Sequence, residues 1–183
     1  MKRVVLVCVS VVVCTIGCGD RGEKAPPPAA KGALPTVSPS PQPPPPPTID
    51  KEKTKALFAR ISGKQIGDGP GRVEVRDLGI LIHPGTTRPT RVEFKLDKSA
   101  KALTLAAFIC PLPAEARTIA QAGTVSLQLQ ADGRELDTVA IDRYSPWVRR
   151  LELQGVEVLT VTVTNGDGKT WWDWFFLGVT GQD

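Results

Sequence analysis

Apolar and polar side chains alternate along most of the chain after residue 71. An alternation with period two sends successive side chains to opposite faces of an extended segment, so it predicts half-buried β-strands. Gly, Pro, Asp and Asn interrupt the pattern at short intervals, where we expect the chain to turn. The pattern predicts about nine strands, over residues 73–75, 80–82, 92–96, 103–110, 125–131, 136–141, 148–153, 159–164 and 171–177.

Many short strands with hardly any helix favour an all-β fold, an antiparallel β-sandwich of jelly-roll-like form. The clearest local signal is Asp132-Gly133, which lies between two alternating segments and predicts a hairpin turn. Residues 103–110 and 171–177 are apolar on both faces, so both are expected to be central strands.

The residues before the sandwich fall into three predicted parts. Residues 50–61 have the only helical character and form a short helix or an extended lead-in. Residues 62–71 contain four glycines and a proline, which predicts a loop. We therefore assign 49–71 to a lead-in segment and loop, and 72–183 to the sandwich.

The first residues have the layout of a secretory signal, with a basic start, an apolar run over 4–13, and Thr15-Ile16-Gly17-Cys18. This end resembles a bacterial lipobox, which implies removal of 1–17 as a signal peptide and acyl chains such as palmitate on Cys18. The alternative is an uncleaved anchor, but residues 4–17 fall short of the roughly 20 that a bilayer core requires. The expected location is the cell membrane or the outer membrane, outside the cytoplasm.

A proline-rich linker over 18–48 follows, and 11 of the 17 prolines lie between residues 25 and 48. Such composition predicts a disordered, extended tether that advances about 3.1 Å per residue. The alternative role is a ligand for a proline-reading domain. From residue 49 onward, 18 Lys or Arg balance 17 Asp or Glu, so no nucleic-acid partner is expected.

The residue inventory argues against catalysis. His83 is the only histidine, and Cys110 is the only cysteine after Cys18. With one imidazole and one cysteine that is interpreted as buried, we expect neither a His-rich zinc site nor a Cys/His nucleophile pair, and a Ser/His/Asp triad lacks a G-x-S-x-G elbow motif. We therefore expect no enzyme, cofactor or metal. Cys110 ends an apolar run and is interpreted as a buried side chain. Calcium at Asn165, Asp167 and Asp173 is the open alternative, although these are fewer than the 6–8 oxygens that calcium takes.

Tryptophan clustering favours sugar binding instead. Indole rings stack on the apolar face of a sugar, while its hydroxyls need polar groups such as Asp, Asn or His. The candidate carbohydrate-binding residues are His83, Trp147, Asn165, Asp167, Trp171, Trp172, Asp173 and Trp174. The alternative is that the aromatic rings fill the core. We interpret Trp174 as a core residue, and leave both roles open for the other tryptophans.

Several segments in order resemble the NPCBM family of carbohydrate-binding modules, which is similar to carbohydrate-binding module family 51. They are Gly79-Ile80-Leu81-Ile82-His83-Pro84, Val92-Glu93-Phe94-Lys95-Leu96, Gly123-Thr124-Val125 running to Asp132-Gly133, Leu153-Gln154-Gly155-Val156 with Leu159, and Asp173-Trp174. The resemblance covers about 72–179. It implies a β-sandwich that binds galactose-type glycans, with His83, Asp173 and Trp174 at family positions.

The sequence therefore favours a membrane-anchored, non-catalytic carbohydrate-binding module whose partner is a glycan or glycoconjugate of the bacterial cell envelope. The alternative is a structural or protein-interaction β-sandwich lipoprotein that binds no sugar.

Overall fold

The computed structural model describes residues 42–110, 123–166, 168 and 173–180. The predictions for the signal segment, for Cys18 and for most of the linker fall outside these residues. So do those for Asp167, Trp171 and Trp172.

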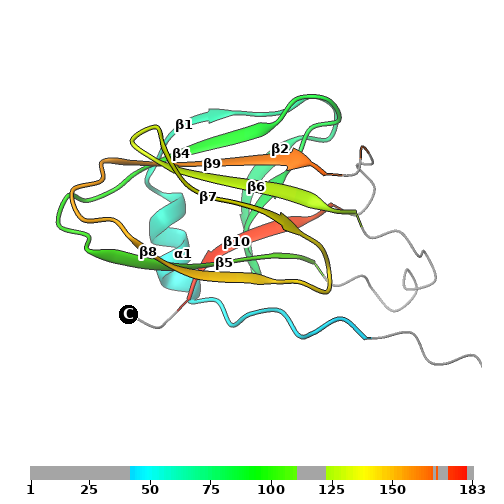
Figure 1. Cartoon of the computed structure of the whole chain (residues 1–183), viewed down its shortest axis with the longest axis horizontal. Coiled ribbons are helices and arrows are strands. Elements are labelled where there is room, and N and C mark those ends of the chain that lie inside the picture. Colours follow the sequence, from blue (N-terminus) through cyan, green and yellow to red (C-terminus); the bar gives the residue numbers. More distant parts are fainter. Residues whose placement is uncertain (1–41, 111–122, 167, 169–172, 181–183) are drawn as a thin grey trace, which may run out of the picture. The chain divides into compact units, whose positions relative to one another are not determined.

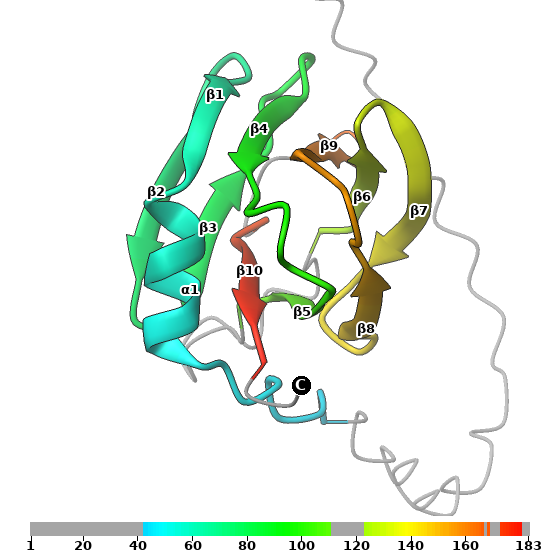
Figure 2. The same cartoon turned by 90° about the vertical axis from the view of Figure 1, so that its left-hand side faces the viewer.

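Two antiparallel sheets of five strands form the fold (Figures 1 and 2). The first sheet has the order β1-β4-β9-β6-β7, and the second has the order β2-β3-β10-β5-β8. The predicted antiparallel β-sandwich is confirmed, and most connections cross between the sheets. The elements are α1 (Lys51–Phe58), β1 (Ile61–Gln65), β2 (Arg72–Arg76), β3 (Gly79–His83), β4 (Thr90–Lys95), β5 (Ala102–Ile109), β6 (Val125–Ala131), β7 (Arg134–Ile141), β8 (Trp147–Glu152), β9 (Val158–Asn165) and β10 (Phe175–Val179).

The alternation seen in the sequence becomes an alternation of burial. In β6, Val125, Leu127 and Leu129 are fully buried, while the residues between them are partly exposed. The same holds for Val161 and Val163 of β9, which pairs with β6. These side chains fill the space between the sheets, where apolar burial stabilises the fold by about 25 cal/mol per Å².

Local sequence signals also fix the β6–β7 hairpin and the central strands. Asp132 and Gly133 have φ of 46° and 81°, as a tight hairpin turn requires. The Asp132 carboxylate also accepts a 2.9 Å hydrogen bond from the Val158 amide, which ties the hairpin to β9. As predicted for 103–110 and 171–177, β5 and β10 each lie between two other strands of the second sheet. The last strand is displaced from its predicted bounds, because β10 is Phe175–Val179 and residues 173 and 174 precede it.

The lead-in segment contributes more to the fold than predicted. Asp50 caps α1 by accepting a hydrogen bond from the Lys53 amide, and its own amide donates to Val179 at 2.8 Å. The Thr54 hydroxyl accepts from the Val179 amide at 2.9 Å, and Leu57 packs into the core. This short helix is therefore fixed against β3 and β10 (Figure 2). No helix in the described part of the chain is long and apolar enough to cross a membrane.

The prediction of a loop over 62–71 is wrong in its first part. Residues Ile61–Gln65 form β1, an edge strand that pairs with β4. Their sequence, ISGKQ, has no clear alternation of apolar and polar residues, so pairing with the β4 backbone rather than its side-chain pattern makes it a strand. The sandwich therefore begins before residue 72.

The last residues of the linker lie against the domain. Pro43 to Pro46 line a narrow space of about 10 Å³ together with Phe108, Ile109 and Pro146. Ile49 packs so closely on Gly178 that a β-carbon there would lie 2.6 Å from the isoleucine. The compact unit Ser40–Asp183 thus holds these contacts and the whole described core, so we expect the fragment 40–183 to fold on its own.

Candidate functional site

The outer face of the second sheet, which points away from the first sheet, carries its own apolar cluster. Leu81, Phe108 and Phe176 form this cluster, separately from the core between the sheets. Phe176 pairs in register with both of the others, and the rings of Phe108 and Phe176 stack with centroids 5.8 Å apart. The three side chains are only 3–4% exposed, and Ile49 packs against them, so this aromatic platform is a firm but covered support and not itself open to a ligand.

Trp174 lies at the end of this platform, immediately before β10. Its carbonyl accepts a 2.9 Å hydrogen bond from the Cys110 amide, which extends the pairing of β10 with β5. The Phe175 amide donates to the Asp173 carbonyl at 2.8 Å, and this closes a three-residue turn around Trp174. The tryptophan is 46% exposed.

The interpretation of Trp174 as a core residue is therefore wrong. The flanking residues Asp173 and Phe175 are both fully buried. Because the turn sends these two side chains inward, the indole between them is directed to solvent. An exposed indole next to an ordered platform can stack on the apolar face of a sugar.

His83 ends β3, and the register of Leu81 with Phe176 brings this end beside the start of β10. Alternation along β3 puts His83 on the same outer face as Leu81, since Ile82 belongs to the main core. The imidazole is buried, and its Nδ1 donates a 2.8 Å hydrogen bond to the Pro84 carbonyl. Burial lowers the pKa of His83, and the positive charge of Arg72 lowers it further. The ring is thus neutral at neutral pH.

Arg72 is a site residue that the sequence did not single out. It pairs in register with His83 and is exposed on β2, the edge strand. One of its guanidinium nitrogens lies 3.7 Å from the Glu74 carboxylate. A hydrogen bond from Arg76 lowers the pKa of Glu74, which is therefore an ionised acceptor beside a donor. The only sequence signal for Arg72 was its place opposite His83 in neighbouring strands. We call exposed Trp174 and Arg72, together with Glu74, half-buried Cys110 and buried His83, the Trp174 surface.

Asp173, just before β10 of the second sheet, and Asn165, at the end of β9 in the first sheet, lie away from the outer face. Asp173 is fully buried, and a β-carbon added to Gly123 would lie only 1.5 Å from its Oδ1. Asn165 is the last residue of β9 and pairs with Val125. Its amide nitrogen and oxygen are buried and have no hydrogen-bond partner among the described residues. These side chains hold the end of the sandwich and do not share a surface with Trp174.

Trp147 is also separated from the Trp174 surface. It packs against the core between the sheets, where its Nε1 donates to Asp137 at 3.1 Å. Burial raises the pKa of Asp137, but hydrogen bonds from Arg149 and Trp147 outweigh this effect and lower the pKa overall. The indole therefore buttresses the edge between β7 and β8. No group of three His, Cys, Asp or Glu side chains within the described ranges could hold a metal ion.

Comparison with known proteins supports the fold. No family model and no curated protein matches the sequence. Among solved structures, the chain is similar to the CBM51 of Clostridium perfringens GH95 in complex with methyl-galactose. The match has a TM-score of 0.50 at 10% identity, and covers 66% of this chain and 94% of that one. It is also similar to the M60 catalytic domain with the CBM51-1 and CBM51-2 domains of Clostridium perfringens ZmpB. Here the TM-score is 0.51 at 12% identity, covering 67% of this chain but only 14% of that one. The chain thus has the fold of carbohydrate-binding module family 51.

Proposed function

We propose that the chain is a non-catalytic carbohydrate-binding module that takes a galactose-type sugar on the Trp174 surface. The observation that carries this proposal is the exposed indole of Trp174, held at the end of a rigid aromatic platform in a CBM51-like sandwich. The first structural relative is described in complex with methyl-galactose, which suggests the first sugar to test.

The chemistry of the surface suits a sugar. The indole supplies an apolar face for the ring carbons, and Arg72 supplies hydrogen-bond donors for the hydroxyls. Glu74 supplies acceptors at a distance of 3.7 Å from that guanidinium. Binding through one aromatic face and a few polar contacts buries little area, so we expect weak, reversible affinity.

Calorimetric titration of the fragment 40–183 with methyl galactoside tests the proposal. Replacing Trp174 with Ala should weaken binding at least tenfold, which corresponds to about 1.4 kcal/mol. Tyr144→Ala is the matched control, because it removes an exposed aromatic ring from the loop between β7 and β8. No binding of galactosides, peptidoglycan fragments or capsular sugars by the wild-type fragment would refute the proposal.

We further propose that acyl chains on Cys18 hold this module at the bacterial cell envelope. The support is the order of basic start, apolar run and Gly17-Cys18 in the sequence. Burial of acyl chains contributes about 0.8 kcal/mol per CH₂, so several chains give a stable anchor. The full chain should label with radioactive palmitate and sediment with membranes, whereas Cys18→Ala should do neither. Equal labelling of both proteins would exclude this cysteine as the anchor.

A further inference from the structure

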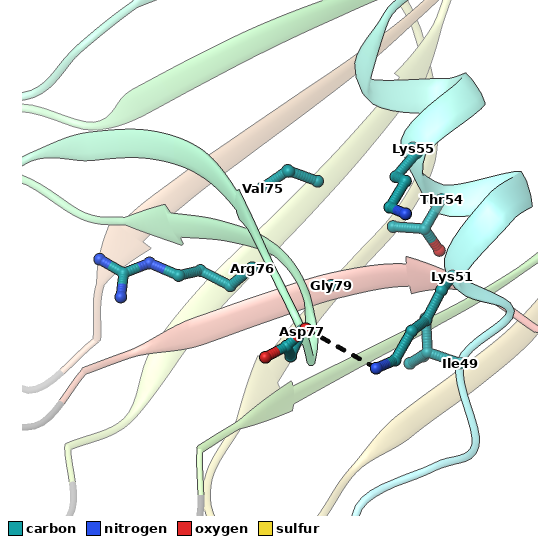
Figure 3. Close-up of a pocket in the computed structure, with 8 residues that line it drawn as sticks. All are labelled: Ile49, Lys51, Thr54, Lys55, Val75, Arg76, Asp77 and Gly79. Atoms are coloured by element: carbon teal, nitrogen blue, oxygen red, sulfur yellow. Dashed lines mark ion pairs between the residues drawn. The ribbon is translucent and has the colours of Figure 1, made fainter.

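A cavity lies at the opposite end of the β2–β3 hairpin from the Trp174 surface. It has a volume of about 440 Å³ and lies between the first turns of α1 and the turn that joins β2 to β3 (Figure 3). Sites for small molecules have volumes of roughly 300–1,000 Å³, so one sugar unit fits. Arg72 and Arg76 mark the two ends of β2, which puts this cavity roughly 13 Å from the Trp174 surface.

The cavity has rigid walls. Thr54, one of its lining residues, is almost fully buried and accepts the hydrogen bond that fixes α1 to Val179. Gly79 lines another part of the cavity with its backbone alone. A side chain is excluded here, since a β-carbon would lie 2.7 Å from the Leu177 carbonyl oxygen. Ile49 and Val75 add apolar surface. The backbone frame from which the charged side chains project is therefore fixed without a ligand.

Two ammonium groups and one carboxylate supply the charge. Lys51 and Lys55 are four residues apart on α1 and so project from the same side of the helix. Asp77 projects from the β2–β3 turn, with its carboxylate 3.7 Å from the Lys51 ammonium. Figure 3 shows the guanidinium of Arg76 directed away from the lysines, and it contacts Glu74 instead.

These lysines can exchange their present partners for a ligand at low cost. Lys51 pairs with exposed Asp77, and Lys55 pairs with exposed Glu52 at 3.0 Å. Exposed ion pairs of this kind contribute about 0–1 kcal/mol. A ligand anion between the two ammonium groups would replace them with charge-assisted hydrogen bonds.

We infer that this cavity binds the anionic group of an acidic sugar, either a uronate or a sugar phosphate. The carboxylate or phosphate would lie between Lys51 and Lys55, and a hydroxyl would donate to Asp77. A bare anion would be repelled by Asp77 and would leave the apolar wall uncovered. Lysine ammonium groups act as point charges, so they can bind either a carboxylate or a phosphate. The inference extends the proposed sugar binding to a second subsite of different charge.

The test is an NMR titration of the fragment 40–183 with galacturonate, galactose 6-phosphate, methyl galactoside, sulfate and alanine. Both acidic sugars should shift the amide signals of α1 and the β2–β3 turn. The double variant Lys51→Gln, Lys55→Gln should weaken their binding at least tenfold. Raising the salt from about 0.02 M to about 0.3 M should weaken it as well, because the contacts are exposed and charged.

The matched control is Lys53→Gln, Lys64→Gln, which removes the same charge from exposed positions outside the cavity. An equal loss of binding in both double variants would overturn the site, since only the overall charge would then matter. Sulfate or alanine binding as tightly as the acidic sugars would overturn the assignment to a sugar.

The two proposals fail separately. Methyl galactoside binding that requires Trp174 and tolerates Lys51→Gln, Lys55→Gln supports the Trp174 surface, whatever happens at the cavity. Acidic-sugar binding that tolerates Trp174→Ala supports the cavity alone. If the acidic sugars shift only the signals around Trp174, the second subsite is refuted.

Discussion

Gly123 offers the most direct test of how the Trp174 surface is built. A β-carbon at this position would lie 1.5 Å from Oδ1 and 2.5 Å from Cγ of Asp173. Real β-carbons do not approach other heavy atoms closer than about 3.0 Å, so the carboxylate would have to move by roughly 1.5 Å. Because Asp173 is fully buried, it cannot swing into solvent. The start of β10 must then separate from the start of β6.

Forced repacking of this kind costs about 1–3 kcal/mol. For a domain of this size, we expect the melting temperature of Gly123→Ala to fall by roughly 3–9 °C. Galactoside affinity should fall as well, because Trp174 directly follows the displaced aspartate. Thermal unfolding followed by circular dichroism gives the stability, and calorimetric titration gives the affinity.

Gly63→Ala is the matched control. Its β-carbon would also meet a carboxylate, 2.8 Å from Oε2 of Glu93, but that side chain is partly exposed on the first sheet and can move. Neither glycine has a positive φ, so backbone strain does not separate the two variants. We expect a change within about 0.5 kcal/mol for the control. Equal melting temperatures for both variants and the wild type would refute the packing of Asp173 on Gly123.

Two further predictions concern His83 and Trp147. Because burial lowers the pKa of folded His83, the unfolded chain binds its proton more readily; stability should be greatest above pH 6.5 and fall as the pH drops below it. Thermal unfolding at pH 7.5 and pH 5.5 should show this loss of stability in the wild type and a smaller loss in His83→Asn. An identical loss in the variant would exclude His83 as the source of the pH dependence. Trp147→Phe removes the hydrogen bond to Asp137 and should cost about 1 kcal/mol in denaturant unfolding. Galactoside affinity should stay within about twofold in that variant, and a tenfold loss would instead make Trp147 part of the binding surface.

The sequence predicted the strands wherever side-chain burial determines the structure. β6 and β9 were predicted to be strands because apolar residues alternate with polar ones, and the same apolar residues fill the core. It missed β1 because that strand is held by backbone pairing to β4, which leaves no side-chain pattern. The sequence predicted a linker through residue 48, and Pro43 to Pro46 near its end are exposed side chains that line a small space together with Phe108.

Site residues were harder to predict because a sequence gives the type of each residue but not the face of the sheet on which its side chain lies. Asn165 was a candidate sugar-binding residue just after the strand predicted over 159–164, yet it ends β9 with its amide buried. Trp174 was interpreted as a core residue but is exposed, and Trp147, for which both roles were left open, packs against the core between the sheets. Arg72 became a candidate only through its register with His83. Each of these facts depends on pairing between distant strands, which a local pattern cannot encode.

The adjacent residues Asp173 and Trp174 link the stability of the domain to its proposed function. The short turn closed by the Phe175 amide separates their side chains, one into the interior and one to solvent. A buried carboxylate tolerates displacement poorly, because its environment must stay matched to its charge. Asp173 therefore acts as a positioning residue: by fixing the start of β10 it fixes the indole, without contacting a ligand on the outer face. Asp173-Trp174, one of the segments that carried the family resemblance, thus combines an anchor in the core with the exposed side chain that we propose binds the sugar, and a substitution at either position should affect sugar affinity through a different cause.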